Sequence, residues 1–368
     1  MPQKQKPLSF LACMSPALRE YYSSKHRLMA ASLAEMPRRA SRPWLAKRGG
    51  AAAADLPPAG VTEGANRPSW HYIERHGKML RPLLCCILLE AFDKKPENFR
   101  SLLGMIEFME ASTISFDDIV DDSPLRRGVP STHKIYGVPV AYAASQALYN
   151  QAWHALFDSN SPIPPRERLE ILDTLAREIF AYGFGQCEEL YWSRQRKIVS
   201  EEQYLQMTYN RIIFLSFNGP VRIGALVGGC RGARLRNLVE FAAWLGLAYH
   251  LHGDELNILP RSGEWGKVVA DDIPSGRVTL LFIHAYNHTR GDARRVLMKP
   301  FGDNGASSSS IRAAVRAIRD SGAVERNRLF IDRFRRKALG CLRVARLPRN
   351  SDGLLRDCLE FMSSTRPL

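Results

Sequence analysis

Apolar residues recur at helical spacing along most of the chain after Trp70, and short Pro-, Gly- or Asn-containing breaks separate the stretches. Alternating β-branched stretches are rare, and no Asn-Gly or Asp-Gly hairpin signal occurs. The pattern therefore predicts one all-α domain, a helical bundle, over residues 67–368. Its helices are expected over residues 69–92, 97–122, 139–158, 165–194, 201–229, 233–259, 277–300, 309–321 and 323–344, with a short one near 351–363.

The first 66 residues lack this periodicity and are rich in Pro, Ala, Arg and Lys. Such composition predicts a disordered basic N-terminal arm over residues 1–66, with a short helix near Met14–Ala30. The arm is also Arg-rich and acid-poor, as organellar transit peptides are. A cytoplasmic location is expected, with organelle targeting by the arm as the alternative.

The formal net charge of +15 changes the picture less than its size suggests, because it is concentrated at the two ends. Residues 1–66 contribute +6 and residues 290–349 contribute +11, which leaves −2 for the remainder. We interpret both basic regions as solvated surface and expect no nucleic-acid partner. The chain contains no run of 18 apolar residues, so no membrane-spanning helix is predicted. Seven cysteines without paired spacing favour a reducing compartment over a disulfide framework.

The sharpest chemical feature is the run Asp117-Asp118-Ile-Val-Asp121-Asp122, which Arg126 and Arg127 follow. Asp117 and Asp121 stand at i and i+4, so their carboxylates share one face of a helix. Like charges at the C-terminal end of a helix are destabilising unless a cation offsets them. Mg²⁺ held by one or two carboxylates keeps positions free for phosphate oxygens, which arginines also grip. The run therefore indicates a site for magnesium and a phosphorylated substrate.

These residues resemble the first aspartate-rich motif of the trans-prenyl diphosphate synthases, with the closest likeness to fungal geranylgeranyl diphosphate synthases. The likeness extends over residues 70–362 in the family's order. The fold it implies is the all-α isoprenoid synthase bundle around a central cavity, opening at the helix ends that carry Asp117 and Asp254. The other similar segments are Gly77–Pro82, Gly185–Trp192, Leu245–Leu259 and Gly266–Arg277.

The resemblance assigns a role to each matching residue. Asp117, Asp121 and Asp254 would ligate Mg²⁺, three ions per site in the family pattern, with Asp118 in support. Arg126, Lys267 and Arg277 would neutralise an allylic prenyl diphosphate, and Gln186 would line its site. Lys78, Arg81 and Arg127 would hold isopentenyl diphosphate. The family's usual partner is a second copy, so a homodimer is expected.

Four departures from the family pattern bear on the function. In the segment that matches the family's second aspartate-rich motif, Gly253 replaces a metal-binding aspartate, so fewer ions would bind unless Asp254, Glu255 or Asn257 compensates. His250 replaces a glutamine before that motif, and Arg211-Ile212 replaces a Lys-Thr pair, followed by Ile213-Phe214 in place of Gly-Gly. Glu110 replaces a histidine that contacts isopentenyl diphosphate, and a carboxylate there would repel the substrate.

The favoured hypothesis is therefore a class I terpene cyclase, which ionises farnesyl or geranylgeranyl diphosphate without a second substrate. The first alternative is chain elongation with isopentenyl diphosphate, in which Glu110 merely pairs with a nearby Arg or Lys. The second is an inactive regulatory subunit of an active synthase. Aromatic residues at Phe116, Phe180, Phe184, Phe214 and Tyr249 are candidates to line the cavity and stabilise cations.

Overall fold

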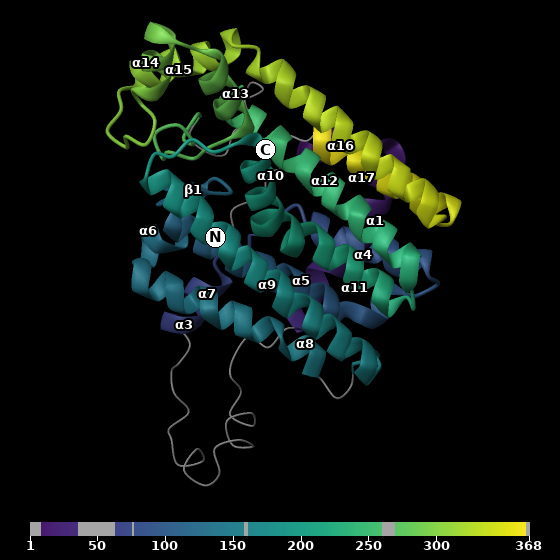
Figure 1. Cartoon of the computed structure of the whole chain (residues 1–368). Coiled ribbons are helices and arrows are strands. Elements are labelled where there is room, and N and C mark those ends of the chain that lie inside the picture. The colour runs from purple at the N-terminus through teal and green to yellow at the C-terminus, as the bar shows by residue number, and fades with distance from the viewer. Residues whose placement is uncertain (1–8, 36–62, 76, 158–160, 260–268, 366–368) are drawn as a thin grey trace. The chain divides into compact units, whose positions relative to one another are not determined.

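The computed structural model describes residues 9–35, 63–75, 77–157, 161–259 and 269–365 (Figure 1). The chain forms two compact units. Unit 1 comprises Met1–Tyr21, Ile87–Asp93 and Leu169–Leu368, and unit 2 comprises Tyr22–Cys86 and Lys94–Arg168. Apart from one short hairpin, the regular structure of the described residues is helical, which confirms the predicted all-α class.

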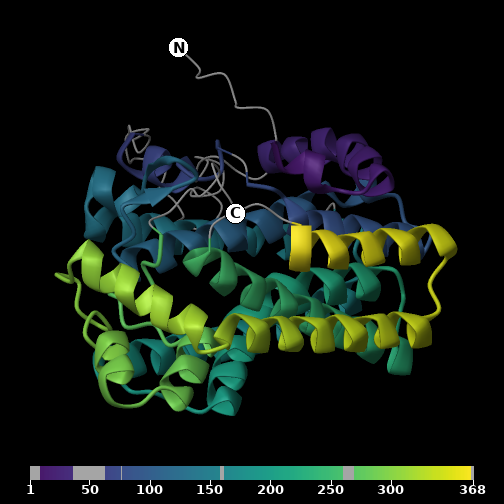
Figure 2. The same cartoon turned by 90° about the horizontal axis from the view of Figure 1, so that it is seen from above.

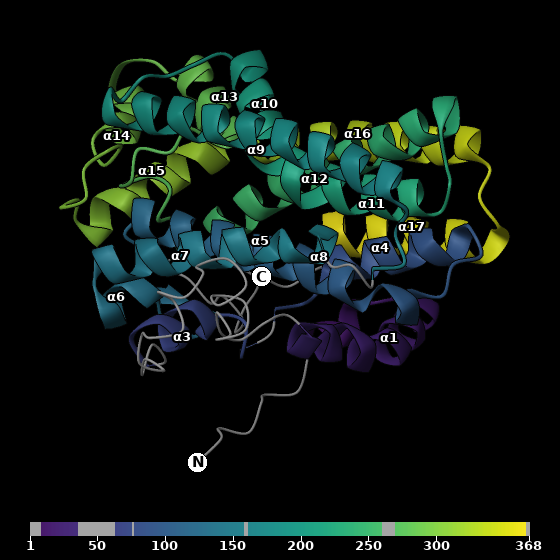
Figure 3. The same ribbon diagram turned by 90° about the horizontal axis from the view of Figure 1, so that it is seen from below.

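Unit 2 is built on helix α5 (Arg100–Val120), which packs against α7 (Val138–Ala152), as Figure 3 shows. Helix α3 also packs on α7, and the ring of Trp70 meets Phe108 of α5 edge-on at 5.5 Å. The first half of α5 is buried on nearly every side, which orients the helix firmly. The remaining elements of this unit are α3 (Glu63–Trp70), η2 (Pro96–Phe99), β1 (Leu125–Arg126), β2 (Val129–Pro130), α6 (Thr132–Tyr136), α8 (His154–Phe157) and the start of α4 (Leu80–Ala91).

Unit 1 is built on helix α12 (Gly232–Ile258), which lies along α16 (Ala323–Ala345) in Figures 1 and 2. Buried residues occur all round α12, as its continuous apolar sequence predicts. The other main elements are η1 (Ser9–Cys13), α9 (Pro165–Arg194), α10 (Glu201–Thr208), η3 (Tyr209–Asn218), α11 (Gly219–Val227), α13 (Leu280–His288), α14 (Gly291–Met298), α15 (Ser308–Asp320), α17 (Arg349–Glu360) and η4 (Phe361–Thr365).

Local sequence explains where several helices begin. Ser200 caps α10 in a capping box, since its hydroxyl accepts from the N–H of Gln203 while the Gln203 side chain accepts from the N–H of Ser200. Thr279 caps α13 by accepting from the N–H of Phe282. These caps fix the helix starts next to the segments that carry charged residues.

Four helix predictions need correction. The helix expected over 139–158 is divided at Trp153 into α7 and α8. The expected helix over 69–92 is interrupted between Trp70 and Leu80, and that over 277–300 breaks after His288. Residues 201–229 contain the π-helix η3 between α10 and α11. Wide π turns are rare and occur often at functional sites, and η3 carries Arg211.

No hairpin is predicted from the sequence, yet β1 and β2 pair through a two-residue turn of Arg127 and Gly128. Both turn residues have positive φ, 54° and 75°, the combination that a type I′ turn requires. A non-glycine residue in this region is strained and persists only where its surroundings hold it. The hairpin therefore sets the directions of Arg126 and Arg127.

The N-terminal arm is folded over part of its length, which corrects the prediction of disorder there. Helix α1 (Pro16–Glu35) is longer than the short helix expected near Met14–Ala30, and Leu18, Tyr22 and Met29 on it are almost fully buried. Residues 1–8 and 36–62 lie outside the described residues, so the arm stays a prediction over those segments.

Candidate active site

Asp118, near the end of α5, is fully buried and satisfied within unit 2. Its carboxylate accepts from Nε of Arg126 at 2.9 Å and from the hydroxyl of Tyr72 at 2.6 Å. The Tyr72 hydroxyl in turn accepts from the backbone N–H of Thr132 at 3.1 Å. Asp118 therefore ties the end of α5 to the hairpin, and its support of the neighbouring metal ligands stays a prediction.

Asp117 and Asp121 flank this network and are both half-buried. Asp121 caps α5, and its N–H donates to the carbonyl of Asp117 at 2.8 Å. No group of three or more His, Cys, Asp or Glu side chains that could hold a metal occurs within the described residues. Two carboxylates that leave coordination positions to phosphate oxygens suit Mg²⁺, so the donors present fit this ion.

Arg127 lies against the segment Gly77–Pro82. Its Nη1 donates to the carbonyl of Tyr72 at 2.8 Å, and a Cβ on Gly77 would lie only 2.6 Å from its Nη2. The glycine thus leaves room for the guanidinium. This contact brings together two segments to which the resemblance assigns isopentenyl diphosphate, and Lys78 follows Gly77 directly.

The buried Glu110 forms an ion pair with the half-buried Arg81, with 2.8 Å between Oε2 and Nε. Burial raises the pKa of Glu110, while Arg81 and Arg127 lower it in part. Glu107, one turn earlier on α5, is also buried, and its pKa is raised to about 7. Two arginines and two carboxyl groups therefore share this part of unit 2.

The raised pKa of Glu107 predicts how folding stability changes with pH. In the unfolded chain the Glu107 carboxyl loses its proton above its ordinary pKa of 4.5, whereas in the folded protein it keeps the proton up to a pKa of about 7. The contribution of neutral Glu107 to folding stability is therefore complete below pH 4.5 and is lost as the pH rises through about 7. We expect Glu107→Gln to stabilise the protein by up to about 3 kcal/mol at pH 8 and little at pH 4. Denaturant unfolding at both pH values measures this.

Glu97→Gln is the control, because the exposed Glu97 pairs with Lys25 and its pKa is lowered. That substitution should not stabilise the protein at either pH. An equal response of the two variants at pH 8 would contradict the assignment to Glu107.

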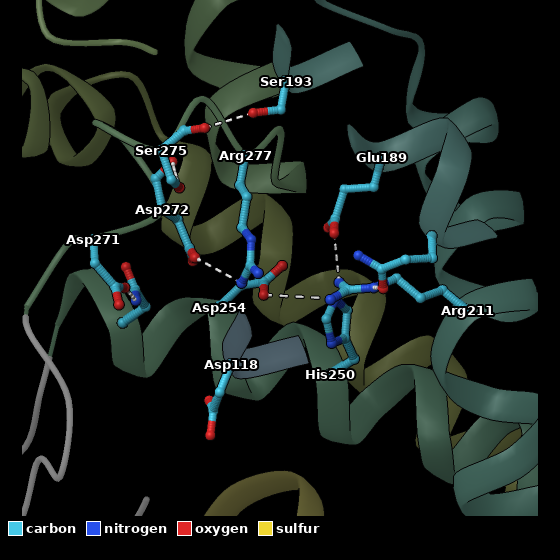
Figure 4. Close-up of polar contacts among 12 residues, drawn as sticks. Asp118, Glu189, Ser193, Arg211, His250, Asp254, Asp271, Asp272, Ser275 and Arg277 are labelled. Atoms are coloured by element: carbon cyan, nitrogen blue, oxygen red, sulfur yellow. Dashed lines mark hydrogen bonds and ion pairs between the residues drawn. The ribbon is translucent and has the colours of Figure 1, made fainter. Parts of the chain in front are cut away.

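In unit 1, Arg211 is buried between two side chains of α9 (Figure 4). Its Nε donates to Oε1 of Gln186 at 2.6 Å, and its Nη1 lies 2.7 Å from Oε2 of Glu189. Gly185 permits this approach, since a Cβ there would lie 2.7 Å from the backbone nitrogen of Arg211. The structure thus brings together two predicted substrate residues, Gln186 and Arg211.

The degenerate second motif keeps one central carboxylate. Asp254 is buried, accepts from the Tyr204 hydroxyl at 2.5 Å, and lies 3.7 Å from Nε2 of His250 (Figure 4). Burial raises the pKa of Asp254 to about 7. A cation would favour its charged form, so Asp254 remains the proposed metal ligand of this motif.

The other candidates to replace the missing ligand have protein partners. Glu255 accepts from Nε and Nη2 of Arg328 at 2.9 and 2.7 Å. The amide of Asn257 donates to Asp271 at 2.5 Å, which adds a carboxylate that the sequence argument did not include. Glu255 is neutralised by the guanidinium of Arg328, whereas the hydrogen-bond donor 2.5 Å from Asp254 is a neutral hydroxyl, so Glu255 is a poorer candidate than Asp254.

An ion pair and a hydrogen bond hold the segment before α13. Arg277 lies 3.6 Å from Asp272, and the hydroxyl of Ser193 donates to the carbonyl of Ser275 at 2.5 Å (Figure 4). Lys267, which is predicted to neutralise the allylic diphosphate together with Arg277, lies outside the described residues. The side chain of Phe214 lies outside them too, so the roles of both residues stay predictions.

The aromatic residues suggested as a cavity lining divide into two groups. Phe116 is half-buried, and Tyr249 is half-buried with its ring 5.1 Å from that of Phe217. Phe180 and Phe184 are 68% and 58% exposed and contact each other, so their suggested place in a lining is wrong for the chain as described. With Leu169 and Tyr191 they form an exposed apolar stripe on α9.

Neither Tyr72 nor Tyr204 was picked out from the sequence, yet each donates a hydroxyl to a motif aspartate. Arg328 was missed as well. The position of Tyr72 just before the Gly77–Pro82 segment could have indicated from the sequence that it belongs to the site. No feature of the sequence indicates this for Tyr204 or Arg328.

The comparisons with known proteins agree with this arrangement. The model of the polyprenyl synthetase family matches residues 63–318. The chain is 29% identical over 251 residues to a geranylgeranyl diphosphate synthase of Sulfolobus acidocaldarius. The matched stretch covers 68% of this chain and 76% of that protein. This chain belongs to the polyprenyl synthetase family.

Solved structures share the fold over nearly the whole chain. The geranylgeranyl pyrophosphate synthetase of Pyrococcus horikoshii gives a TM-score of 0.79 at 22% identity and covers 94% of this chain and 98% of its own. A geranylgeranyl pyrophosphate synthase of Corynebacterium glutamicum was solved with isoprenyl diphosphate and magnesium. It gives a TM-score of 0.79 at 20% sequence identity and covers 94% of this chain and 99% of its own. The isoprenoid synthase fold is therefore confirmed.

Other expectations stay predictions, including the likeness to fungal members, the homodimer, the cellular location and the absence of a nucleic-acid partner. Among the helices that the structure describes, none combines the length and apolar character needed to cross a membrane.

Proposed function

We propose that this protein is a prenyl diphosphate synthase, which extends an allylic diphosphate with isopentenyl diphosphate. One observation carries the choice of elongation: Glu110, the residue expected to repel the second substrate, is paired with Arg81 in a buried site beside Arg127. A neutralised carboxylate there does not exclude a diphosphate. The cyclase hypothesis rested on that repulsion, and the relatives reported above are synthases.

The chemistry of elongation breaks the allylic carbon–oxygen bond, and the diphosphate leaves with the electron pair. The double bond of isopentenyl diphosphate then forms a new carbon–carbon bond with the allylic carbon, and loss of a proton restores a double bond. Mg²⁺, when bound, stabilises the charge on the departing diphosphate. Asp117, Asp121 and Asp254 would hold the ions, while Arg126, Arg211 and Arg277 would orient the allylic diphosphate.

One incubation tests this proposal. Purified protein, Mg²⁺ and farnesyl or geranylgeranyl diphosphate are combined with and without isopentenyl diphosphate, and a matched set contains EDTA. A longer prenyl diphosphate that requires both isopentenyl diphosphate and Mg²⁺ is expected. A hydrocarbon or alcohol made from the allylic substrate alone would support cyclisation instead, and no turnover would favour the regulatory subunit.

Restoring histidine at Glu110 should improve the second substrate site. In Glu110→His, Arg81 loses its internal carboxylate and a potential hydrogen-bond donor is gained, so we expect the KM for isopentenyl diphosphate to fall about 10-fold. The KM for the allylic substrate should change little. Steady-state kinetics with each substrate varied in turn measures both values.

Glu97→Gln again serves as the control, because it also removes a glutamate from a basic partner but in an exposed pair. A KM for isopentenyl diphosphate that rises in Glu110→His would mean that the Arg81–Glu110 pair helps to bind this substrate, contrary to the expectation that Glu110 weakens the site.

A further inference from the structure

His71 lies in the turn that follows α3 in unit 2, and both nitrogens of its buried ring have hydrogen-bond partners. Nε2 lies 3.1 Å from the carbonyl oxygen of Pro130, and Nδ1 lies 2.9 Å from Nη1 of Arg75. The same Nη1 donates to the backbone carbonyl of His71 at 2.6 Å. The imidazole therefore connects the turn with the hairpin strand β2.

These partners determine which ring nitrogen carries the proton. An arginine side chain can only donate, so Nδ1 must accept, and a carbonyl can only accept, so Nε2 must donate. Burial and the neighbouring Arg75 lower the pKa of His71, which keeps the ring in this neutral form at pH 7. The ring thus needs a donor on one side and an acceptor on the other, and a purely apolar side chain cannot replace either bond.

The bond to Pro130 holds the open end of the hairpin. Pro130 is paired with Leu125, which starts β1, and a two-stranded hairpin is only marginally stable by itself. At the turn of the hairpin, Arg127 donates to the carbonyl of Tyr72, the residue directly after His71. Two adjacent residues, His71 and Tyr72, therefore hold both ends of the hairpin.

The contact with Arg75 holds the other partner of this arrangement, the turn that leads to the Gly77–Pro82 segment. The guanidinium of Arg127 occupies the space that a Cβ on Gly77 would fill. A shift of the hairpin relative to the turn would therefore disturb the contact between the two segments to which we assign isopentenyl diphosphate.

We propose that His71 is a positioning residue for the isopentenyl diphosphate site, because it holds the hairpin that carries Arg127 against the Gly77–Pro82 segment. His71 acts through Arg127, so it is not a catalytic residue. This inference rests on the proposed function, since it concerns the binding of the second substrate.

The test compares full-length wild type, His71→Gln and His71→Phe. Glutamine offers a donor and an acceptor, whereas phenylalanine keeps only the ring that contacts Tyr72 and Tyr136. His26→Phe is the matched control, because His26 is a half-buried histidine of unit 2 whose ring also contacts a tyrosine, Tyr22. Steady-state kinetics gives kcat and the KM for each substrate, and titration calorimetry measures the binding of isopentenyl diphosphate alone.

We expect His71→Phe to raise the KM for isopentenyl diphosphate about 10-fold, with a matching loss of affinity in calorimetry. The KM for the allylic substrate and kcat at saturation should change much less, because Arg126 is also tied directly to the buried Asp118. His71→Gln and His26→Phe should resemble the wild type. A residue needed only to fill space would give the reverse order, with phenylalanine tolerated and glutamine harmful.

An unchanged KM for isopentenyl diphosphate in a folded His71→Phe, or an equal rise in His71→Gln, would overturn the inference alone. If His71→Phe does not fold, Arg75→Met removes the bond to Nδ1 from an exposed position. It should raise the same KM about 3-fold, and an unchanged value would overturn the inference. A wild type that forms no elongated product would overturn the proposed function, and the calorimetric affinities for isopentenyl diphosphate would still decide the role of His71.

Discussion

Replacing Asp118 with alanine is expected to lower the free energy of unfolding by about 3–5 kcal/mol, the usual cost of removing one partner from a buried ion pair. Asp118 is fully buried, whereas the Arg126 side chain is 19% exposed, so the loss falls toward the lower end. The Tyr72 hydroxyl would also lose its acceptor. Denaturant unfolding followed by circular dichroism measures the change.

Asp122→Ala is the matched control within the same motif. The side chain of Asp122 is 77% exposed and pairs with Lys134, and exposed pairs contribute at most about 1 kcal/mol. Tyr72→Phe should fall between the two variants, because it removes one hydrogen bond to a buried carboxylate. If Asp118→Ala and Asp122→Ala were equally stable, the role given to Asp118 would be wrong.

The second large effect is expected on catalysis. Asp117→Ala should lower kcat by on the order of 10²–10³, the usual cost of removing one group that stabilises charge in a transition state. Asp117 is only half-buried, so the loss of stability should be much smaller than for Asp118→Ala. Titration calorimetry with Mg²⁺ and a non-hydrolysable diphosphate should show weaker metal binding, which separates a lost ligand from a lost fold.

Asp122→Ala again provides the comparison, since its carboxylate is already paired with Lys134 and His133. It should retain most activity and metal affinity. Wild-type turnover in Asp117→Ala would refute the assignment of Asp117 as a metal ligand.

What could be predicted from the sequence was mainly local. The spacing of Asp117 and Asp121 follows from helix geometry alone, and α9 has the bounds that its apolar pattern predicts. The partners of Glu110 and Glu255 could not be predicted in this way. Arg81 lies on another helix, and Arg328 lies 73 residues beyond Glu255, so only the fold brings them together.

The hairpin at Arg127 shows the same limit at short range. Asn-Gly or Asp-Gly is the usual type I′ sequence, and Arg-Gly has no such preference. The contacts of Arg127 with the Tyr72 carbonyl and the space at Gly77 hold the backbone in its positive-φ state. Tertiary contacts thus decide a turn that local propensity leaves open.

Two described segments far apart in the sequence, one before and one after the part that the family model matches, meet within unit 1. The hydroxyl of Ser15 donates to Asp357 at 2.6 Å, and the rings of Phe10 and Phe361 lie 6.3 Å apart. A version trimmed to residues 63–318 would therefore lose both halves of this closure and uncover apolar core. Affinity tags that must be accessible are better placed on long linkers than directly beside Phe10 or Phe361.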